Sequence, residues 1–338
     1  MSDPSAGNLL AGTSPAGTVL ILSDAEVRRV LDMGSCVEAM ESVLADLARG
    51  GLYNPLRFVV RPPGGETFMG FMPAYRGGDH PLFSLKEVVI APGNHARGLD
   101  SHMGGVLVHD GATGELRAMV NASTITEIRT AAVSALATRL LARPESRRIT
   151  VVGSGVQGRS HVAAMRHVFP DAEITIWSRN PDHAARLASA TGDGVADTLA
   201  AALADADVVC TTTASKEPIV TREMLTPGTH YNAVGSSIAA AREFDGAAMA
   251  AVSLFVDRRE STINESGDYL DAVRDAGIGP DHIRAEIGEI LIGAHPGRTC
   301  DDEMTLFKSL GIAVEDLAAA QLCIERARQQ GIGTEAAW

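Results

Sequence analysis

The chain has 338 residues, more than a single hydrophobic core usually supports, so its length predicts two domains. With 45% hydrophobic and 21% charged residues, its composition is that of a globular protein rather than a disordered or fibrous one. The net charge of −13 argues against a general nucleic-acid or membrane-surface binder, because such partners would repel the chain.

The opening of the chain and its cysteines bear on where the protein acts. Residues 1–18 are rich in Gly, Ser, Ala and Pro and lack the basic start and apolar run of a signal peptide, so we expect a flexible tail. No stretch approaches the roughly 20 apolar residues of a membrane-spanning helix, and we expect a cytoplasmic protein without a membrane partner. The four cysteines form no C-x-x-C pair and the ten histidines no metal-binding pattern, so we expect reduced thiols and no metal.

The first region mixes strands and helices. Residues 18–22 form an apolar strand, and the capping-box patterns at Ser23–Glu26 and Ser35–Glu38 each predict the start of a helix. Gly and Pro then separate short runs of strand-forming residues, which predicts a sheet and an α+β domain. These runs are 58–60, 83–90 and 106–109.

The second region alternates apolar strands with helices. A third capping box at Thr124–Glu127 predicts a helix that ends before Pro144. The alternation that follows is typical of a doubly wound parallel sheet, the Rossmann class of α/β fold. Its predicted strands are 149–152, 173–177, 208–211, 230–234 and 254–257. A closing amphipathic helix carries apolar residues from Val314 to Ala327 on one face.

The strongest local signal is the run Gly153-Ser154-Gly155-Val156-Gln157-Gly158, which follows a strand and opens a helix. Gly153 allows a tight turn, Gly155 lets the main chain approach a diphosphate, and Gly158 permits close packing of the helix on the strand. The helix N-terminus attracts the phosphate charge. An isolated G-x-G-x-x-G string is weak evidence, but this strand–turn–helix context predicts dinucleotide binding.

The tip of the second strand bears on the choice of cofactor. NAD-binding folds usually place an acid there for the ribose, whereas this chain has Ser178-Arg179-Asn180. Arg179 could pair with a 2′-phosphate, which favours NADP(H), although the nearby Asp182 leaves NAD(H) possible. Further cofactor contacts are expected where later strands end at the ligand-binding edge, unless their hydroxyls only cap loops. These strand ends are Thr211–Thr213 and Val234–Ser237, with Thr211, Val234, Gly235 and Ser236 as the expected contacts.

Several spaced motifs resemble the ornithine cyclodeaminase/mu-crystallin family, over about residues 20–331. They are Asn54–Arg57, Phe71–Tyr75, Ser123–Ala132, Glu265–Asp268 and Phe307–Gly311. The resemblance implies a Rossmann domain, residues 146–304, inserted in an α+β substrate-binding and dimerisation domain made of residues 19–145 and 305–338. It also implies a homodimer and a small amino-acid or imino-acid substrate.

The resemblance also assigns roles to single residues. Arg57 and Lys86 would bind the substrate carboxylate, and Lys86, desolvated beside other cations, would deliver a proton to the substrate nitrogen. Asp316 matches a catalytic acid of the family, although a carboxylate in the first turn of a helix is also favoured by the helix dipole. The remaining assignments are Arg129 and Thr130 near the diphosphate, Ser309 beside the nicotinamide, and Leu310 beside both the nicotinamide and the substrate.

One departure from the family bears on the reaction. Family members that cyclise ornithine carry an Asp after the Val-Gly at 234–235, where this chain has Ser236-Ser237. Serine has no comparable proton affinity near pH 7. We therefore expect NAD(P)H-dependent reduction of a 2-imino acid or cyclic ketimine carboxylate, with L-amino acid dehydrogenation as the reverse. The alternatives are an NAD-dependent cyclodeaminase of a diamino acid and a non-catalytic NADP-dependent binding protein.

Overall fold

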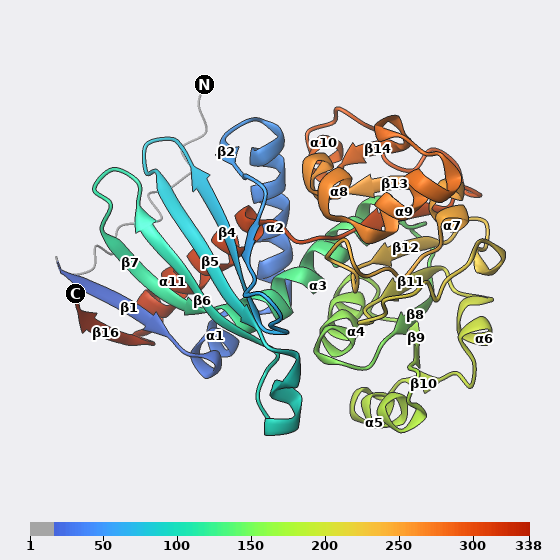
Figure 1. Cartoon of the computed structure of the whole chain (residues 1–338), viewed down its shortest axis with the longest axis horizontal. Helices are drawn as coiled ribbons and strands as arrows, with labels where there is room; N and C mark the ends of the chain where they lie inside the picture. Colours follow the sequence, from blue (N-terminus) through green and yellow to red (C-terminus); the bar gives the residue numbers. More distant parts are fainter. Residues whose placement is uncertain (1–16) are drawn as a thin grey trace. The chain divides into compact units, whose positions relative to one another are not determined.

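The computed structural model describes residues 17–338, which divide into two compact units (Figure 1). Unit 1 contains residues 17–39, 50–128 and 313–338, and unit 2 contains residues 40–49 and 129–312. The expected tail, 1–18, lies outside the described residues except for its last two, and Thr18 already begins a strand. Within the described part of the chain, no helix is long and apolar enough to cross a membrane.

Unit 1 is built on a mixed sheet with the strand order β16-β1-β7-β6-β5-β4-β2, in which β3 also pairs with β4. Neighbouring strands are antiparallel except for β1 and β7, which are parallel. The strands are β1 (Thr18–Leu22), β2 (Leu52–Tyr53), β3 (Phe58–Val60), β4 (Phe68–Arg76), β5 (Leu82–Ile90), β6 (His102–Asp110), β7 (Leu116–Asn121) and β16 (Thr334–Ala337). The sheet predicted from strand-forming runs is confirmed.

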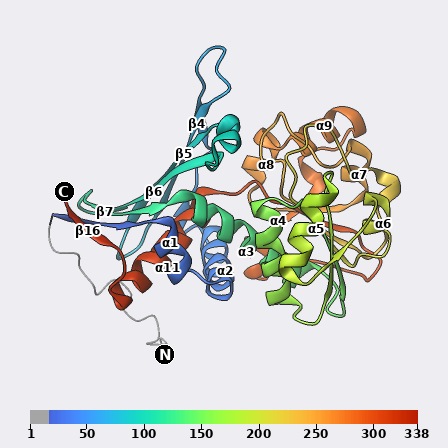
Figure 2. The ribbon, with the colours of Figure 1, turned by 90° about the horizontal axis from the view of Figure 1, so that it is seen from below.

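Helices cover one face of this sheet. α11 (Ala313–Gln330) contacts β4, β5, β6 and β7, and α1 (Asp24–Val30) packs beside it (Figure 2). The predicted apolar face of α11 is buried, because residues at spacings of three and four lie on one side of a helix. A short 3-10 helix, Pro92–Arg97, follows β5. Two longer helices, α2 (Met33–Ala48) and α3 (Ala122–Leu141), contribute residues to both units.

Only one of the three predicted capping boxes starts a helix. The Ser23–Glu26 box forms before α1 as predicted. The predicted starts at Ser35 and Thr124 are wrong, because α2 and α3 begin two residues earlier. Asp32 accepts the Ser35 N–H at 2.9 Å, and Asn121 accepts the Thr124 N–H at 3.0 Å. The pattern S/T-x-x-E also occurs inside a first turn, where an Asp or Asn before it takes the capping role.

Unit 2 contains an all-parallel sheet with the order β10-β9-β8-β11-β12-β15-β13-β14, which confirms the predicted α/β class. Its strands are β8 (Arg148–Val152), β9 (Glu173–Trp177), β10 (Gly194–Val195), β11 (Val208–Thr211), β12 (His230–Ala233), β13 (Ser253–Val256), β14 (Ile283–Glu286) and β15 (Thr305–Lys308). The strand order reverses between β8 and β11, the place where doubly wound sheets bind ligands. Residues 305–308 were expected in the substrate-binding and dimerisation domain, but they pair with β12 and β13 of unit 2.

The central strands of this sheet are buried along nearly their whole length, as parallel strands covered on both faces must be. The helices of unit 2 are α4 (Val156–Val168), α5 (Pro181–Thr191), α6 (Leu199–Leu203), α7 (Gly246–Ala251), α8 (Arg259–Glu265), α9 (Gly267–Ala276) and α10 (Ile287–Leu291), with 3-10 turns at Arg222–Met224 and Pro280–His282. The core includes the large side chains of Tyr231, Phe244 and Tyr269.

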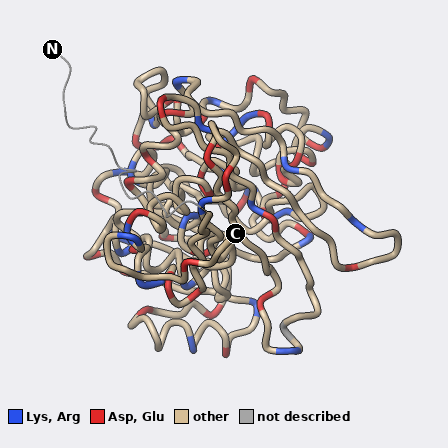
Figure 3. The backbone as a smooth tube through the Cα atoms, turned by 90° about the vertical axis from the view of Figure 1, so that its left-hand side faces the viewer, with Lys and Arg blue, Asp and Glu red and all other residues tan. Residues whose placement is uncertain are grey.

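Charged residues of both signs are mixed along the chain. On the side shown in Figure 3, Lys and Arg residues are interspersed with Asp and Glu residues rather than gathered into one basic region. The full sequence has 42 acidic and 29 basic residues.

Candidate functional site

The glycines of the turn after β8 have three different environments. Gly153 has φ +124°, and a Cβ there would lie 2.5 Å from the Thr212 hydroxyl oxygen. A Cβ on Gly158 would lie 2.2 Å from the carbonyl oxygen of Gly153, so only glycine lets α4 pack this closely on the turn. A Cβ on Gly155 would meet nothing within 4 Å. Gly155 therefore leaves open space at the N-terminus of α4, where a diphosphate would be stabilised by the helix.

A pocket of about 560 Å³ lies beside this turn, wholly within unit 2. This volume is in the range of cofactor sites. The walls come from the loops that follow β8, β9 and β11, at the reversal of strand order. The lining residues are Gly153–Gly155, Trp177–Asn180, His183, Thr212–Ser215 and Ile219. A bound dinucleotide would fit the open space at Gly155 and the main chain around it.

The tip of β9 forms one end of the pocket. Three residues that were predicted to bind the cofactor line this end: Ser178, Arg179 and Asn180. The hydroxyl of Ser154 donates a hydrogen bond to the hydroxyl of Ser178 at 3.0 Å. The Asn180 side chain accepts the N–H of Asp182 and so caps α5. His183, in the first turn of α5, also lines the pocket and was not among the predicted residues. Its position three residues after a capping Asn was the available signal.

Other predicted cofactor residues do not line this pocket. Thr211 is fully buried, whereas the following residues, Thr212–Ser215, form a wall of the pocket. Thr212 and Thr213 belong to the predicted strand end, but Ala214 and Ser215 were not predicted. The signal for them was the end of a strand at the ligand-binding edge. Ser236 is also fully buried, with its hydroxyl bound to Asp268. The predicted cofactor residues outside the lining are Arg129, Thr130, Val156, Gln157, Gly158, Thr211, Val234, Gly235, Ser236 and Ser309.

Arg129 and Thr130, expected near the diphosphate, are buried on α3 in the part that belongs to unit 2. A Cβ on Gly311 would lie 2.5 Å from one terminal guanidinium nitrogen of Arg129. The guanidinium therefore packs against the main chain of Gly311, whose φ of +72° already favours glycine. The structure thus brings Arg129 together with the loop that follows β15.

That loop is held by a carboxylate that the sequence analysis missed. The N–H groups of Leu310 and Gly311 both donate to Asp257 Oδ2 at 2.7 Å, and the N–H of Ser309 donates to the carbonyl oxygen of Ala233 at 3.0 Å. Asp257 is buried directly after β13. Two amide donors on one oxygen fix the path of the loop.

Unit 1 contains a buried ion pair made of two predicted catalytic residues. Lys86 Nζ lies 2.7 Å from Asp316 Oδ2, and their side chains are 5% and 1% exposed. β5 carries Lys86 on the face covered by α11, and Asp316 lies in the first turn of α11. Lys86 was expected to lie beside cations, but this neighbour is a carboxylate. An ion pair stabilises the ammonium form, so the lysine holds a proton that it can donate.

The Asn54–Arg57 motif lies between β2 and β3 of the same unit. Asn54 is buried, and its side-chain oxygen accepts the N–H of Val314 at 3.1 Å. This contact satisfies a free donor at the start of α11, two residues before Asp316. Arg57 is partly exposed at the end of the motif. A planar guanidinium there suits a carboxylate ligand.

Among residues 17–338, no three His, Cys, Asp or Glu side chains gather closely enough to hold a metal ion.

Unit 2 has the features of the dinucleotide-binding proteins as a class: a parallel sheet, a glycine turn, and a pocket where the strand order reverses. Unit 1 adds a mixed sheet with a buried Lys–Asp ion pair. The chain belongs to the ornithine cyclodeaminase/mu-crystallin family, which matches residues 18–331. It is 39% identical to the mouse ketimine reductase mu-crystallin over 307 residues, 89% of this chain and 95% of that protein.

Solved structures agree with this family. The structure of Thermococcus litoralis Delta(1)-pyrroline-2-carboxylate reductase with NADH and L-proline has a TM-score of 0.89 and 32% identity, and covers 94% of this chain and 100% of its own. An archaeal alanine dehydrogenase dimer with bound NAD has a TM-score of 0.88 and 29% identity, over 94% and 99% of the two chains.

Proposed function

We propose that the protein uses NAD(P)H to reduce a 2-imino acid or a cyclic ketimine carboxylate, with oxidation of an L-amino acid as the reverse reaction. The observation that carries the proposal is the buried Lys86–Asp316 pair, which places a protonated amine beside a carboxylate in a family whose relatives include a ketimine reductase and a pyrroline-carboxylate reductase. When bound, the nicotinamide supplies a hydride to the imine carbon.

Each residue of unit 1 has a distinct part in this proposal. Arg57 binds the substrate carboxylate through its planar fork of donors. Lys86 binds the same carboxylate and donates a proton to the imine nitrogen, which becomes the amine. Asp316 holds Lys86 in place and stabilises its charged form before the transfer.

Cyclodeamination is disfavoured by the state of the carboxylates near Ser236. The expected base is replaced by Ser236 and Ser237, and Asp268, the acid bound to the Ser236 hydroxyl, is fully buried. Asp268 accepts the Ser236 hydroxyl and is paired with Lys308 at 3.0 Å. A carboxylate so engaged is not available as a base for a substrate amine.

The test is the absorbance of NADH or NADPH at 340 nm with a panel of imines: five- and six-membered cyclic ketimine carboxylates, and pyruvate with ammonia or methylamine. We expect turnover with at least one imine and a loss of about 100-fold or more in kcat for Lys86→Met. Glu87→Gln is the matched control, because the neighbouring side chain of a strand points to the opposite face.

The other outcomes separate the alternatives. No turnover with any imine would contradict the proposal. Release of ammonia from a diamino acid without net change in the cofactor would indicate a cyclodeaminase. Tight ligand binding, with turnover unaffected in an Arg57→Ala/Lys86→Ala variant, would indicate a binding protein.

We further propose that NADP(H) is preferred over NAD(H), although the related structures hold NADH or NAD. The pocket end formed by Ser178, Arg179 and His183 offers a hydroxyl, a guanidinium and an imidazole, with no acid among its lining residues. These groups suit a 2′-phosphate. Arg179→Gln should weaken NADPH binding while leaving NADH binding nearly unchanged; equal loss for both would contradict the preference.

A homodimer in the cytoplasm completes the proposal. The β3–β5 region of unit 1 exposes large apolar side chains, including Phe58, Val60 and Phe83, and such a patch marks an association surface. The archaeal relative is a dimer. The four cysteines form no disulfide, which suits a reducing compartment. Light scattering should give twice the chain mass, and a monomer would contradict the dimer.

A further inference from the structure

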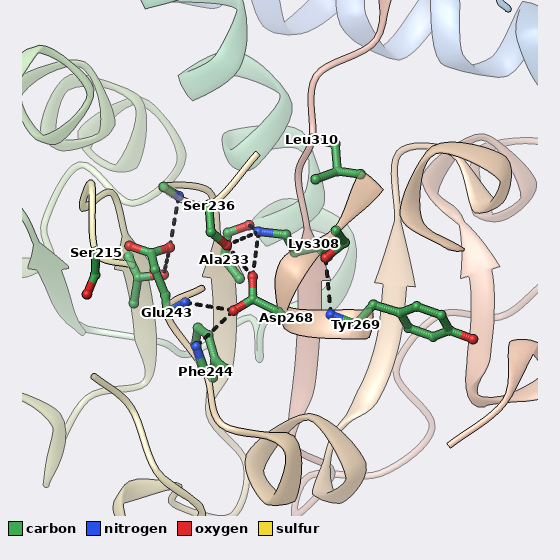
Figure 4. Close-up of polar contacts among 12 residues, drawn as sticks. Ser215, Ala233, Ser236, Glu243, Phe244, Asp268, Tyr269, Lys308 and Leu310 are labelled. Carbon is green, nitrogen blue, oxygen red and sulfur yellow. Dashed lines mark hydrogen bonds and ion pairs between the residues drawn. The ribbon is translucent and has the colours of Figure 1, made fainter. Parts of the chain in front are cut away.

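Three charged side chains that the proposed reaction does not use are buried at the carboxyl edge of the parallel sheet. Glu243, Asp268 and Lys308 are each fully buried, and Figure 4 shows them joined through hydrogen bonds and an ion pair. Charges without water are costly unless every polar atom is paired, so the partners of each group indicate what it holds in place.

Asp268 holds the two ends of the loop that follows β12. One carboxylate oxygen accepts the hydroxyl of Ser236 at the start of the loop. The other accepts the N–H groups of Glu243 and Phe244 at its end, at 2.7 and 2.9 Å. Asp268 lies in the first turn of α9, so this helix anchors both ends of the loop.

Lys308 completes the charge balance of Asp268. Its ammonium lies 3.0 Å from Asp268 Oδ2 and donates to the Ser236 hydroxyl at 3.0 Å and to the Ala233 carbonyl at 3.2 Å. All three donors of the ammonium are therefore used. Desolvation offsets much of the Coulomb attraction within a buried ion pair. The main effect of the Lys308–Asp268 pair is therefore on the shape of the loop rather than on the net stability of the fold.

Glu243 connects this loop to the wall of the pocket. One carboxylate oxygen accepts the N–H and the hydroxyl of Thr213, at 2.7 and 2.8 Å. The other accepts the hydroxyl of Thr211 at 2.7 Å and the N–H of Gly235 at 2.8 Å. Thr213 lines the pocket, whereas Glu243 does not.

The loop after β12 touches the 212–215 segment, which follows β11, at Gly235. A Cβ at this position would lie 2.0 Å from the carbonyl oxygen of Thr213 and 2.5 Å from Glu243 Oε1. Only glycine allows this approach, so a change in the loop after β12 must move the 212–215 segment.

We propose that Glu243 is a positioning residue for the dinucleotide: its carboxylate, supported by Asp268 and Lys308, fixes the 212–215 wall in the shape that binds the cofactor. This inference rests on the proposed cofactor site. It adds that three residues with no contact to the pocket determine its affinity.

The hydrogen bonds require a carboxylate at this position. Each oxygen of Glu243 accepts one main-chain N–H, from Thr213 on one side and Gly235 on the other. In Glu243→Gln the amide NH₂ replaces one of these oxygens, and in either orientation it faces an N–H donor. The substitution changes few atoms but breaks the connection between the two loops.

The test compares four variants with the wild type by fluorescence titration with NADH and with NADPH, at a temperature where circular dichroism shows all five proteins to be folded. Glu243→Gln should raise both Kd values about tenfold. Thr211→Val removes one hydrogen-bond donor to the Glu243 oxygen that does not contact Thr213, and it should raise both Kd values about threefold. The double variant should bind no more weakly than Glu243→Gln alone, because both changes break one connection. Glu223→Gln, an exposed acid of the same unit, is the control and should match the wild type.

A second measurement separates positioning from general destabilisation. With imine turnover, the KM for the dinucleotide should rise in Glu243→Gln, while the KM for the imine at saturating dinucleotide should not change. Wild-type Kd values for Glu243→Gln, or for Thr211→Val if the first variant does not fold, would overturn the inference and leave the proposed function intact. No binding of either dinucleotide by the wild type would overturn both.

Discussion

Adding one methyl group at Gly155 should separate cofactor binding from stability. The main chain there is extended, with φ −79° and ψ −163°, a conformation that alanine adopts freely, and the added Cβ would meet nothing within 4 Å. Restricting the unfolded chain stabilises by about 0.4–1 kcal/mol, and alanine at an N-cap costs about as much. We therefore expect the unfolding free energy of Gly155→Ala to stay within about 1 kcal/mol of the wild type.

The same methyl group should weaken dinucleotide binding strongly. Gly155 lines the pocket at the N-terminus of α4, and a diphosphate that approaches this main chain would overlap the Cβ. Overlap in a packed site costs about 1–3 kcal/mol, which corresponds to about a 5- to 150-fold increase in Kd. Urea unfolding and fluorescence titration with NADPH and NADH measure the two quantities separately.

Gly158→Ala is the matched contrast. Its Cβ would lie 2.2 Å from the Gly153 carbonyl oxygen, so α4 must move away from the turn. This variant should lose both stability and affinity. If Gly155→Ala bound both dinucleotides with wild-type affinity, the diphosphate could not lie against this turn, and the assignment of the pocket would be refuted.

Three further predictions concern two buried ionisable sites and one close main-chain contact. Burial lowers the pKa of His161 to about 4 from 6.5, so its neutral form stabilises the fold above pH 6.5, and this contribution of about 3 kcal/mol is lost as the pH falls toward 4. Urea titrations from pH 7 to 4 should show a smaller loss for His161→Gln, and equal losses would contradict the attribution. Asp316→Asn leaves the Lys86 ammonium buried without its carboxylate and should lower the unfolding free energy by about 3 kcal/mol or more. A Lys86→Met/Asp316→Leu variant should recover most of this in the same assay; no recovery would argue against the ion pair as the cause. Gly235→Ala places a Cβ against Thr213 and forces the two loops apart, so calorimetry should show a lower Tm. An unchanged Tm would show that the loops separate without loss of stability.

The parts of the site that sequence could predict are those whose contacts are local. In the glycine turn after β8, Gly153 and Gly158 lie within six positions of one another, so their spacing indicates how closely α4 packs on the turn. The Rossmann class follows from periodicity for the same reason. The contact of Gly153 with Thr212 is distant in sequence and was not indicated. The capping boxes at Ser35 and Thr124 failed although they are local, because the pattern does not show which residue precedes the first helical turn.

The parts that could not be predicted depend on contacts distant in sequence. Glu243, Asp268 and Lys308 lie 25 and 40 residues apart and meet only because β15 inserts between β12 and β13. Nothing in the residues 305–308 specifies that neighbour, since a short apolar run fits several places in a sheet. Ser236 was expected to face the cofactor, yet the path of its loop turns its hydroxyl toward Asp268.

The discontinuous make-up of unit 1 has a consequence for how the protein is made. Strands β1 to β7 leave the ribosome long before α11, which covers them and carries the partner of Lys86, whereas unit 2 is fully synthesised by residue 312. A nascent chain therefore carries a half-covered sheet through most of its synthesis, and such surfaces recruit chaperones or aggregate. Messages cut short after residue 312 would yield a protein whose parallel sheet is whole but which cells should clear as misfolded.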